Sequence, residues 1–249
     1  MRNTILLLVA VFAVAVLFVS CSAPSPDIPD MEFVEGGVGL FGGDTTEADA
    51  DERPMREVEI VSFYIAKFEV TQSQWEYVMK YNPSLFLDQN RPVESVSWYD
   101  VQEYIKKLNE LTGKSYRLPT ELEWEYAARG GKYQSAYRYS GSDDADDVAW
   151  WRINAINGTS EVGLKSANKL GLYDMTGNVH EWCSNEYDSM LYNRDVVRPN
   201  VVLQPTDKVT VKGGGWSSDT IHLRIANRNH IQPKVQHYTI GFRVAMDAE

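Results

Sequence analysis

The most informative segment of this chain reads Gly177-Asn178-Val179-His180-Glu181-Trp182, and it follows Gly171-Leu172-Tyr173-Asp174-Met175-Thr176. Gly177 permits a positive φ angle, so the segment predicts a tight turn that runs into a buried tryptophan. Asp174 and Glu181 place carboxylates on either side of this turn, and oxygen ligands around a tight loop suit Ca²⁺. The alternative is a turn in which the Asn178 side chain bonds the nearby backbone. On this segment alone, the Asn178 turn is the favoured interpretation.

Further blocks of sequence follow a fixed order along the chain. Upstream lie Phe68-Glu69-Val70-Thr71, Pro92-Val93-Glu94-Ser95-Val96-Ser97-Trp98 and residues 117–131, which read RLPTELEWEYAARGG; downstream lie Gly213-Gly214-Gly215-Trp216 and Gly241-Phe242-Arg243-Val244. Together these blocks resemble the formylglycine-generating enzyme (sulfatase-modifying factor) family over about residues 31–246. The resemblance implies a single compact α+β domain of C-type lectin-like fold, with few helices, short strands and much irregular structure. It also implies a calcium site formed by the Asp174 and Glu181 side chains and the Gly177 and Val179 carbonyls.

Local patterns predict the elements of the first half of the chain. Residues 31–34 and 57–60 predict strands, and a β-branched and aromatic run extends the second prediction through residue 65. Helix starts are predicted where a capping residue has a polar partner three positions on, namely Thr71 with Gln74, Ser97 with Asp100 and Thr120 with Glu123. Gly130-Gly131 predicts the end of the third helix. From residue 132 onward helical patterns fade, so we expect long loops joined by short strands.

The first twenty residues predict a targeting segment rather than part of the fold. Arg2 precedes an uncharged apolar run from Ile5 to Val19, which is shorter than a membrane span of ~20 residues. The run ends in Leu17-Phe18-Val19-Ser20-Cys21, which resembles a bacterial lipobox except that Phe18 stands where leucine is usual. We therefore expect a lipoprotein signal peptide at residues 1–20, lipid on Cys21, a flexible tether at 21–30 and the domain at 31–249. The alternative is an ordinary signal peptide and a structural cysteine. The expected location is the bacterial cell envelope, with the protein lipid-anchored to the outer membrane or cell surface.

The chain is acidic and poor in cysteine. Its formal net charge is −11, and loss of residues 1–20 with Arg2 takes it to −12. This balance argues against nucleic-acid binding, which depends on Lys and Arg neutralising phosphates. Acidic clusters at residues 44–52 and 143–147 predict solvated loops, with weak cation binding as the alternative. If Cys21 carries lipid, Cys183 has no disulfide partner, and its place after Trp182 predicts a small buried side chain.

The resemblance implies oxidase activity only where two cysteines hold Cu(I), because soft thiolates are the ligands that Cu(I) prefers. By resemblance, the pair should follow the Gly213–Trp216 block, and the best-aligned positions hold Ser218 and Leu223. A leucine side chain cannot ligate a metal. We therefore expect neither copper nor formylglycine-generating activity, and the alternative is a working sulfatase-modifying factor.

Two other catalytic arrangements have less support. A second enzymatic branch of the resemblance uses iron held by histidines, and His222, His230 and His237 could converge, although dispersed surface histidines are far more common. Glu121, Glu123 and Glu125 lie two positions apart on a predicted helix, so neighbours in this set do not share a face. We expect capping and surface roles for these glutamates.

Segment 216–240 is the expected location of a binding role. Its mixed side chains follow neither a helical nor an alternating pattern, and they lie between blocks that look structural, as in recognition loops on a rigid frame. The candidate ligand-binding residues are Trp216, Ser218, Asp219, His222, His230, His237 and Tyr238. The alternative is that each is an ordinary core or surface position. The expected partner is an extracellular or envelope ligand, with a protein among the candidates. The segment also resembles the hypervariable end of retroelement-diversified proteins, and a structural component of an envelope complex is a further alternative.

Overall fold

Three helices begin at the capping residues that the sequence indicates. The computed structural model describes residues 27–194, 197, 205 and 207–248. Thr71 caps α1 (Gln72–Met79), Ser97 caps α2 (Trp98–Thr112) and Thr120 caps α3 (Glu121–Ala128). In each case the hydroxyl accepts a backbone N–H and the side chain three residues on accepts the capping residue's own N–H, so two unpaired donors are satisfied. All three predicted helix starts are confirmed.

Strands from the two ends of the domain lie on either side of a third strand in one antiparallel sheet. This sheet has the order β1 (Met31–Val34), β4 (Phe63–Ala66) and β9 (Ala245–Asp247). Between β1 and β4 the chain forms a separate antiparallel ribbon of β2 (Gly37–Phe41) and β3 (Arg56–Ile60). The strands predicted at 31–34 and 57–65 are therefore confirmed, with the second divided between β3 and β4.

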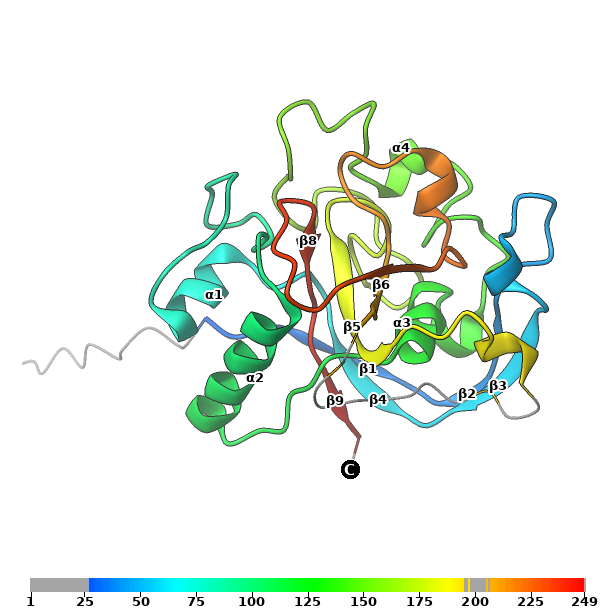
Figure 1. Ribbon diagram of the computed structural model, residues 1–249, viewed down its shortest axis with the longest axis horizontal. Coiled ribbons are helices and arrows are strands. Elements are labelled where there is room, and N and C mark those ends of the chain that lie inside the picture. Colours follow the sequence, from blue (N-terminus) through cyan, green and yellow to red (C-terminus); the bar gives the residue numbers. More distant parts are fainter. Residues whose placement is uncertain (1–26, 195–196, 198–204, 206, 249) are drawn as a thin grey trace, which may run out of the picture.

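A four-stranded sheet carries the Gly177–Trp182 segment. Its order is β7 (Asn229–Ile231), β6 (Val209–Lys212), β5 (His180–Glu186) and β8 (Ile240–Gly241), with β8 parallel to β5 and the other pairs antiparallel. Figure 1 shows this sheet between the α1–α2 pair on one side and α3 on the other. The carboxylates on either side of Gly177, those of Asp174 and Glu181, therefore lie in the interior of the domain.

Tryptophans hold the helices to this sheet. Trp75, Trp98, Trp124 and Trp182 are fully buried. Trp98 Nε1 donates to the Cys183 carbonyl and Trp182 Nε1 donates to the Val96 carbonyl, each at 3.0 Å, so the start of α2 and β5 are bonded reciprocally. Cys183 is fully buried, as expected, and burial together with Glu121 raises the pKa of its thiol. The N–H groups of Trp98 and Trp182 are therefore both bonded where the rings pack, and the two side chains fix the position of β5 in the core.

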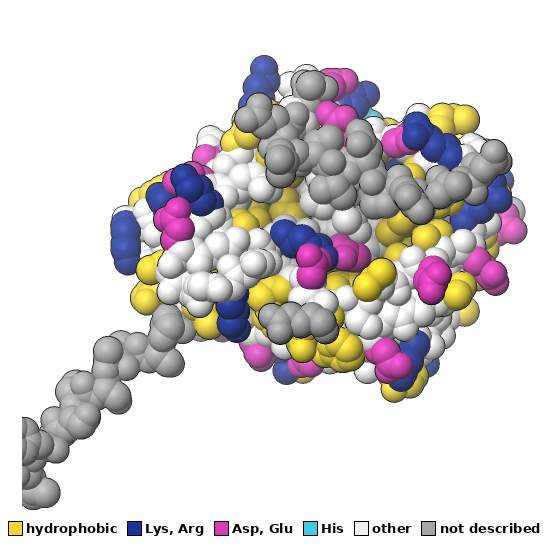
Figure 2. Space-filling view, turned by 90° about the horizontal axis from the view of Figure 1, so that it is seen from below, with side chains coloured by type: hydrophobic (Ala, Val, Ile, Leu, Met, Phe, Trp, Pro, Cys, Tyr) yellow, Lys and Arg dark blue, Asp and Glu magenta, His cyan; other side chains and the backbone are white. Residues whose placement is uncertain are grey.

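Short elements and loops form the rest of the domain. These are η1 (Ala50–Glu52), η2 (Gly131–Tyr133), α4 (Ala145–Val148), η3 (Leu191–Asn193) and η4 (Thr220–Leu223). Among the described residues after 132, α4 is the one α-helix and has only four residues, so the predicted fading of helices is confirmed there. Figure 1 shows the loops around α4, the η4 segment and the chain leading into β8 gathered on the upper side. On the face seen from below, acidic and basic side chains are interspersed with apolar ones, so this view shows no patch of a single charge (Figure 2).

The N-terminal boundary of the domain lies earlier than expected. Lys67 N donates to the Asp30 carbonyl at 2.8 Å, Ile28 packs against the core, and Ser73 bonds the Asp27 carboxylate. Residues 27–30, which we expected in the tether, therefore lie against the domain. The predicted signal peptide and Cys21 lie outside the described residues. Within the part of the chain that is described, no helix has the length and apolar character needed to cross a membrane.

Candidate functional site

The turn before β5 is held by close backbone contacts. Gly177 has a φ of +83°, and a Cβ there would lie 2.3 Å from the Trp150 carbonyl oxygen, so no larger residue fits without movement. Asn178 also has a positive φ, of 57°. Its side chain accepts from Ser160 N at 2.9 Å and donates to Glu69 Oε2 at 2.7 Å. The interpretation of Asn178 as a turn that bonds its own nearby backbone is therefore wrong, because this side chain joins segments distant in sequence.

Four charged groups converge beneath this turn. Arg243 donates from Nη2 to Glu181 Oε1 at 2.6 Å and from Nε to Oε2 at 2.7 Å, while Trp124 Nε1 donates to Oε2 at 2.7 Å. Glu69 accepts from Val179 N at 3.1 Å, and Asp174 Oδ2 accepts from Gly163 N at 2.7 Å. All four charged side chains are buried. We call Glu69, Asp174, Glu181 and Arg243 the buried charge cluster.

The buried charge cluster has more negative than positive groups. Burial raises the pKa of Asp174 to about 6, and burial followed by the charges of Asp174 and Glu181 raises the pKa of Glu69 well above its usual value. Asp174 Oδ1 is buried and has no hydrogen-bond partner. Such an atom is costly unless a proton, a water or a cation compensates it.

The charge balance of the cluster bears on the predicted calcium site. Three carboxylates face one guanidinium, so one divalent ion would balance the cluster if all four groups are ionised. Asp174 Oδ1 has free lone pairs, and Glu181 Oε1 accepts only one of the bonds described above. Among the described residues, no group of three or more His, Cys, Asp or Glu side chains is arranged to hold a metal ion. An ion here would therefore depend on backbone carbonyls as well, as the resemblance implies for Gly177 and Val179.

Aromatic rings from three segments that are distant in sequence meet beside the turn. The ring of Phe86 lies edge-on to Trp216, with 5.4 Å between centroids, and edge-on to Tyr238 at 6.1 Å. His237 stacks on Tyr238 at 4.1 Å, and Trp216 Nε1 donates to the Tyr238 carbonyl at 3.2 Å. We call Phe86, Trp216, His237 and Tyr238 the aromatic surface. Three of its members were candidate ligand-binding residues, and the structure brings them together.

Phe86 was missed in the sequence, although Leu85-Phe86-Leu87 is an apolar run between turn-forming residues. Glu94, a fully buried carboxylate, accepts from Leu85 N at 2.5 Å and Phe86 N at 2.9 Å. Gly158 packs so closely that a Cβ would lie 2.5 Å from the Phe86 ring. Contacts with Glu94 and Gly158 therefore fix the position of the loop that carries Phe86.

The imidazoles of His180 and His222 lie near His237 of the aromatic surface. His180, the first residue of β5, has a buried Nδ1 without a hydrogen-bond partner. Burial, followed by the charges of His222 and His237, lowers the pKa of His180 to about 4. His222 and His237 are exposed, and His237 Nδ1 lies 2.8 Å from the Thr239 hydroxyl. Sequence reasoning quoted His180 within the turn motif but did not include it in the binding set.

The positions aligned with the copper-binding pair have structural contacts. Ser218 N donates to the Gly215 carbonyl at 2.9 Å, and Ser218 Oγ accepts from Gly215 N at 3.0 Å. Leu223 is fully buried and packs on Gly214. Asp219, the neighbour of Ser218, forms an ion pair with Arg152. The segment is therefore a turn with an apolar anchor.

Two expectations differ from the structure. His230 lies on β7, where its ring packs on Tyr187 with 4.3 Å between centroids, so its contacts differ from those of the aromatic surface. Glu121 and Glu125 are fully buried, which corrects the expected surface role. Glu121 pairs with Arg228 at 2.5 Å. Burial alone would raise the pKa of Glu125, but the charges of Lys212 and Arg129 lower it to about 2. Sequence reasoning missed this because the basic partners come from remote segments.

The geometry agrees with comparisons to known proteins. The chain matches the model of the sulfatase-modifying factor enzyme 1-like domain over residues 19–248. Chaperone protein LppX from Paenibacillus barcinonensis is 32% identical over 88% of this chain and 89% of its own length. The formylglycine-generating enzyme of Streptomyces coelicolor is 35% identical over 64% of this chain, and the match covers 54% of that enzyme.

A solved structure extends the comparison to three dimensions. Treponema denticola variable protein 1 matches with a TM-score of 0.78 and 26% identity, over 88% of this chain and 95% of its own. The single domain with few helices, short strands and mixed sheets is the C-type lectin-like fold of these relatives, so the expected fold class is confirmed. The chain therefore belongs to the sulfatase-modifying factor enzyme 1-like domain family.

Proposed function

We propose that this protein is a non-catalytic binding module of the cell envelope, and that the aromatic surface holds a polypeptide partner. The observation that carries the proposal is the contact of Phe86 with Trp216 and Tyr238. Trp216 begins the segment in which the resemblance implies the oxidase thiols, and this segment contains no cysteine. Aromatic rings with a polar edge give large contact area and are enriched at protein interfaces.

Exposed aliphatic side chains next to the aromatic surface favour a polypeptide partner. Leu85 and Leu87, on either side of Phe86 in the chain, are 61% and 73% exposed. Contiguous exposed apolar side chains mark interaction sites. The likeness to LppX, named as a chaperone, supports a second candidate function in which the partner is an incompletely folded client.

Site-specific photo-crosslinking tests the binding proposal. A photoreactive phenylalanine analogue replaces Tyr238 in the full chain, and the same analogue replaces Tyr133 on η2 as a control, since Tyr133 is also exposed, at 56%. We expect the analogue at position 238 to crosslink to a polypeptide, and we expect Trp216→Ala to reduce the yield of this crosslink. Equal crosslinking from positions 238 and 133 would contradict the proposal. For the chaperone candidate, the full chain should suppress aggregation of a reduced, unfolded test protein, and Phe86→Ala should weaken this effect.

The proposed absence of oxidase activity has a direct assay. The full chain is incubated with Cu(I) and a peptide containing Cys-x-Pro-x-Arg, and mass spectrometry then measures conversion of the cysteine to an aldehyde. We expect no aldehyde because the chain has cysteines only at positions 21 and 183. Stoichiometric copper together with turnover would establish the alternative, a working formylglycine-generating oxidase.

Lipid attachment at Cys21 and calcium beside Asp174 complete the proposal. Labelled fatty acid should enter the wild-type protein and not the Cys21→Ser variant expressed in a bacterial host. Calcium would act as a structural ion, since the donor set lies within the domain and balances buried charge. The unpaired Asp174 Oδ1 supports this role.

A further inference from the structure

A cavity lies apart from the aromatic surface, between three segments distant in sequence. Its volume is about 670 Å³, which is within the range of small-molecule sites. The loop at residues 42–47, the segment 134–138 and residues 224–226 contribute to its walls. Leu40, Met55, Tyr137 and Ile225 give it an apolar lining. We call this the strap cavity, because the loop from Gly42 to Pro54 forms one side.

Buried bonds hold the strap in place. Glu52 accepts from Arg224 Nη1 at 2.6 Å and Nη2 at 2.8 Å, and Gly43 N donates to the Glu52 carbonyl at 3.0 Å. Arg129 Nη2 donates to the Gly42 carbonyl at 2.7 Å. Since Glu52 is fully buried and paired, these bonds preform the walls of the cavity.

The charges in and beside the strap cavity do not favour an anion. Arg129 pairs with Glu125 at 2.8 Å, Arg138 with Glu47 at 2.9 Å and Arg224 with Glu52 at 2.6 Å. Asp44 and Asp143 add carboxylates to the lining. An anionic ligand would therefore meet paired guanidinium groups and additional negative charge.

Two buried donors of the lining residues have no hydrogen-bond partner. These are Gln134 Nε2 and Arg138 Nε. Gln134 Oε1 already accepts from Leu40 N at 3.1 Å, so the unsatisfied atom of this amide is its nitrogen donor. Because buried donors are normally hydrogen-bonded, these two favour a ligand that is largely apolar and carries a hydrogen-bond acceptor.

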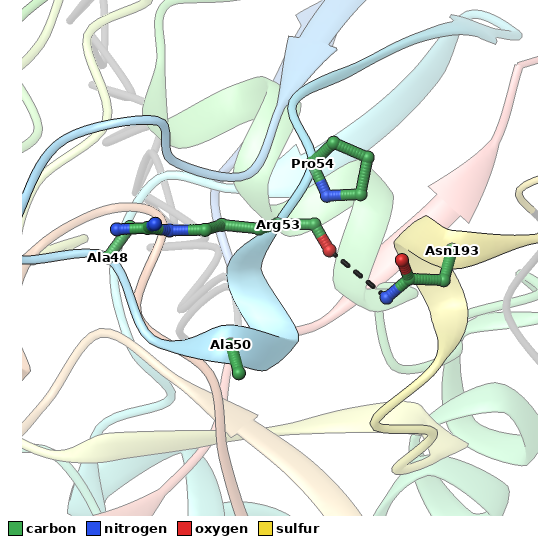
Figure 3. Close-up of a pocket in the computed structure, with 5 residues that line it drawn as sticks. All are labelled: Ala48, Ala50, Arg53, Pro54 and Asn193. Atoms are coloured by element: carbon green, nitrogen blue, oxygen red, sulfur yellow. Dashed lines mark hydrogen bonds between the residues drawn. The ribbon is translucent and has the colours of Figure 1, made fainter.

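A second hollow, also lined by residues of the strap, provides a contrast (Figure 3). It is lined by Ala48, Ala50, Arg53, Pro54 and Asn193. Asn193 Nδ2 donates to the Arg53 carbonyl at 3.2 Å, and the Arg53 guanidinium donates to the Thr45 carbonyl at 2.6 Å. These polar groups bond within the protein, whereas the two unpaired donors belong to residues that line the strap cavity.

We propose that the strap cavity binds an uncharged, mainly apolar small molecule that carries a carbonyl acceptor, such as a short acyl amide. The apolar side chain of the ligand packs on Ile225 and Leu40, and its carbonyl oxygen accepts from Gln134 Nε2 or Arg138 Nε. This site is independent of partner binding at the aromatic surface.

Calorimetric titration of the full chain in lipid nanodiscs tests the proposal, with empty nanodiscs as the blank. The probes are N-acetyl-leucine amide, N-acetyl-leucine and leucine amide, which share one side chain and are neutral, anionic and cationic at neutral pH. We expect the neutral probe to bind at least about tenfold more tightly than either charged probe, a difference of about 1.4 kcal/mol. No saturable heat, or tighter binding of a charged probe, overturns the proposal.

Variants then test the site itself. Gln134→Glu removes the amide donor but keeps an acceptor for Leu40 N, and it should weaken the neutral probe about three- to tenfold. Ala136→Trp, at an exposed lining position, should abolish binding by filling the cavity. Gln102→Glu on α2 makes the same chemical change outside the cavity and should leave affinity unchanged. Wild-type affinity in Gln134→Glu and Ala136→Trp would overturn the site. Trp216→Ala should retain probe binding, so a failure here is distinct from a failure at the aromatic surface.

Discussion

Glu181 and Arg243 form a bidentate ion pair at the centre of the domain, with N–O distances of 2.6 and 2.7 Å. The pair joins β5 to the chain between β8 and β9, and Arg243 also donates to the Ala66 carbonyl at 3.0 Å and the Tyr173 carbonyl at 2.9 Å. One guanidinium therefore connects the turn before β5, the end of β4 and the C-terminal segment. The arginine of the Gly241–Val244 block is thus part of the core.

Removing this guanidinium should destabilise the domain strongly. Arg243→Met leaves Glu181 buried without its ionic partner, so the free energy of unfolding should fall by about 3–5 kcal/mol. Urea unfolding followed by tryptophan fluorescence measures the loss. Arg152→Met is the matched control, because its partner Asp219 is 52% exposed, and it should change stability by less than about 0.5 kcal/mol. Similar losses in both variants would contradict the central role of the pair.

Calcium should stabilise the protein through Asp174. We expect a higher melting temperature in calcium than in chelator, because an ion that binds only the native state adds to its stability. Asp174→Asn can keep an acceptor for Gly163 N while removing the charge, so calcium affinity should fall at least about tenfold. Glu181→Ala should melt at a lower temperature and no longer respond to chelator, but it also breaks the ion pair with Arg243. Asp174→Asn is therefore the more informative variant. Identical wild-type melting curves in calcium and chelator would exclude the ion.

His180 should make stability depend on pH. Its folded pKa is lowered to about 4, whereas an unfolded histidine has a pKa near 6.5, so the unfolded state binds the proton more readily. The contribution is therefore complete above about pH 6.5 and is lost as the pH falls towards 4, by at most about 1.4 kcal/mol per pH unit.

The comparison of wild type with His180→Asn isolates this effect. Asp174, whose folded pKa is raised to about 6, contributes in the opposite direction over much of the same range, but it is present in both proteins. Urea midpoints at several pH values between 4 and 7 give the difference in stability. If that difference does not change with pH, the imidazole is not held neutral.

The turn at Gly177 should tolerate no side chain. Gly177→Ala adds a Cβ 2.3 Å from the Trp150 carbonyl oxygen at a φ of +83°, so we expect a loss of about 2 kcal/mol or more. Gly113→Ala is the matched control, since Gly113 has a φ of +68° and nothing within 4 Å of the added Cβ. The control should lose only about 1 kcal/mol through backbone strain. Equal losses by chemical denaturation would show that the contact with Trp150 has no effect.

Local chemistry made the first half of this fold predictable. The pairs Thr71–Gln74, Ser97–Asp100 and Thr120–Glu123 satisfy helix ends within one turn of chain, so the helix starts could be placed without knowledge of packing. The same reasoning failed for Glu121 and Glu125. Their spacing indicated exposed positions, whereas Arg228 and Lys212, from segments distant in sequence, compensate their burial.

The candidate site divides in the same way. Trp216, His237 and Tyr238 were expected because an irregular segment between structural blocks is typical of recognition loops. Phe86 was not expected, since its place depends on Glu94 and Gly158, and no local pattern relates it to Trp216. His230 was expected in the site and does not lie there. Its position in the sequence suggested the binding segment, but the pairing of β7 with β6 places its ring against Tyr187.

The order of residues alone determined the helix starts, the glycine turn before β5 and the lack of a second thiol in the domain, because each depends on contacts within a few residues or on composition. Tertiary structure decided which carboxylates are buried, which rings share a surface and where the strap leaves a cavity. These outcomes depend on groups brought together from distant parts of the chain. A buried charge is tolerated only where the fold supplies its partner, and no local pattern specifies that partner.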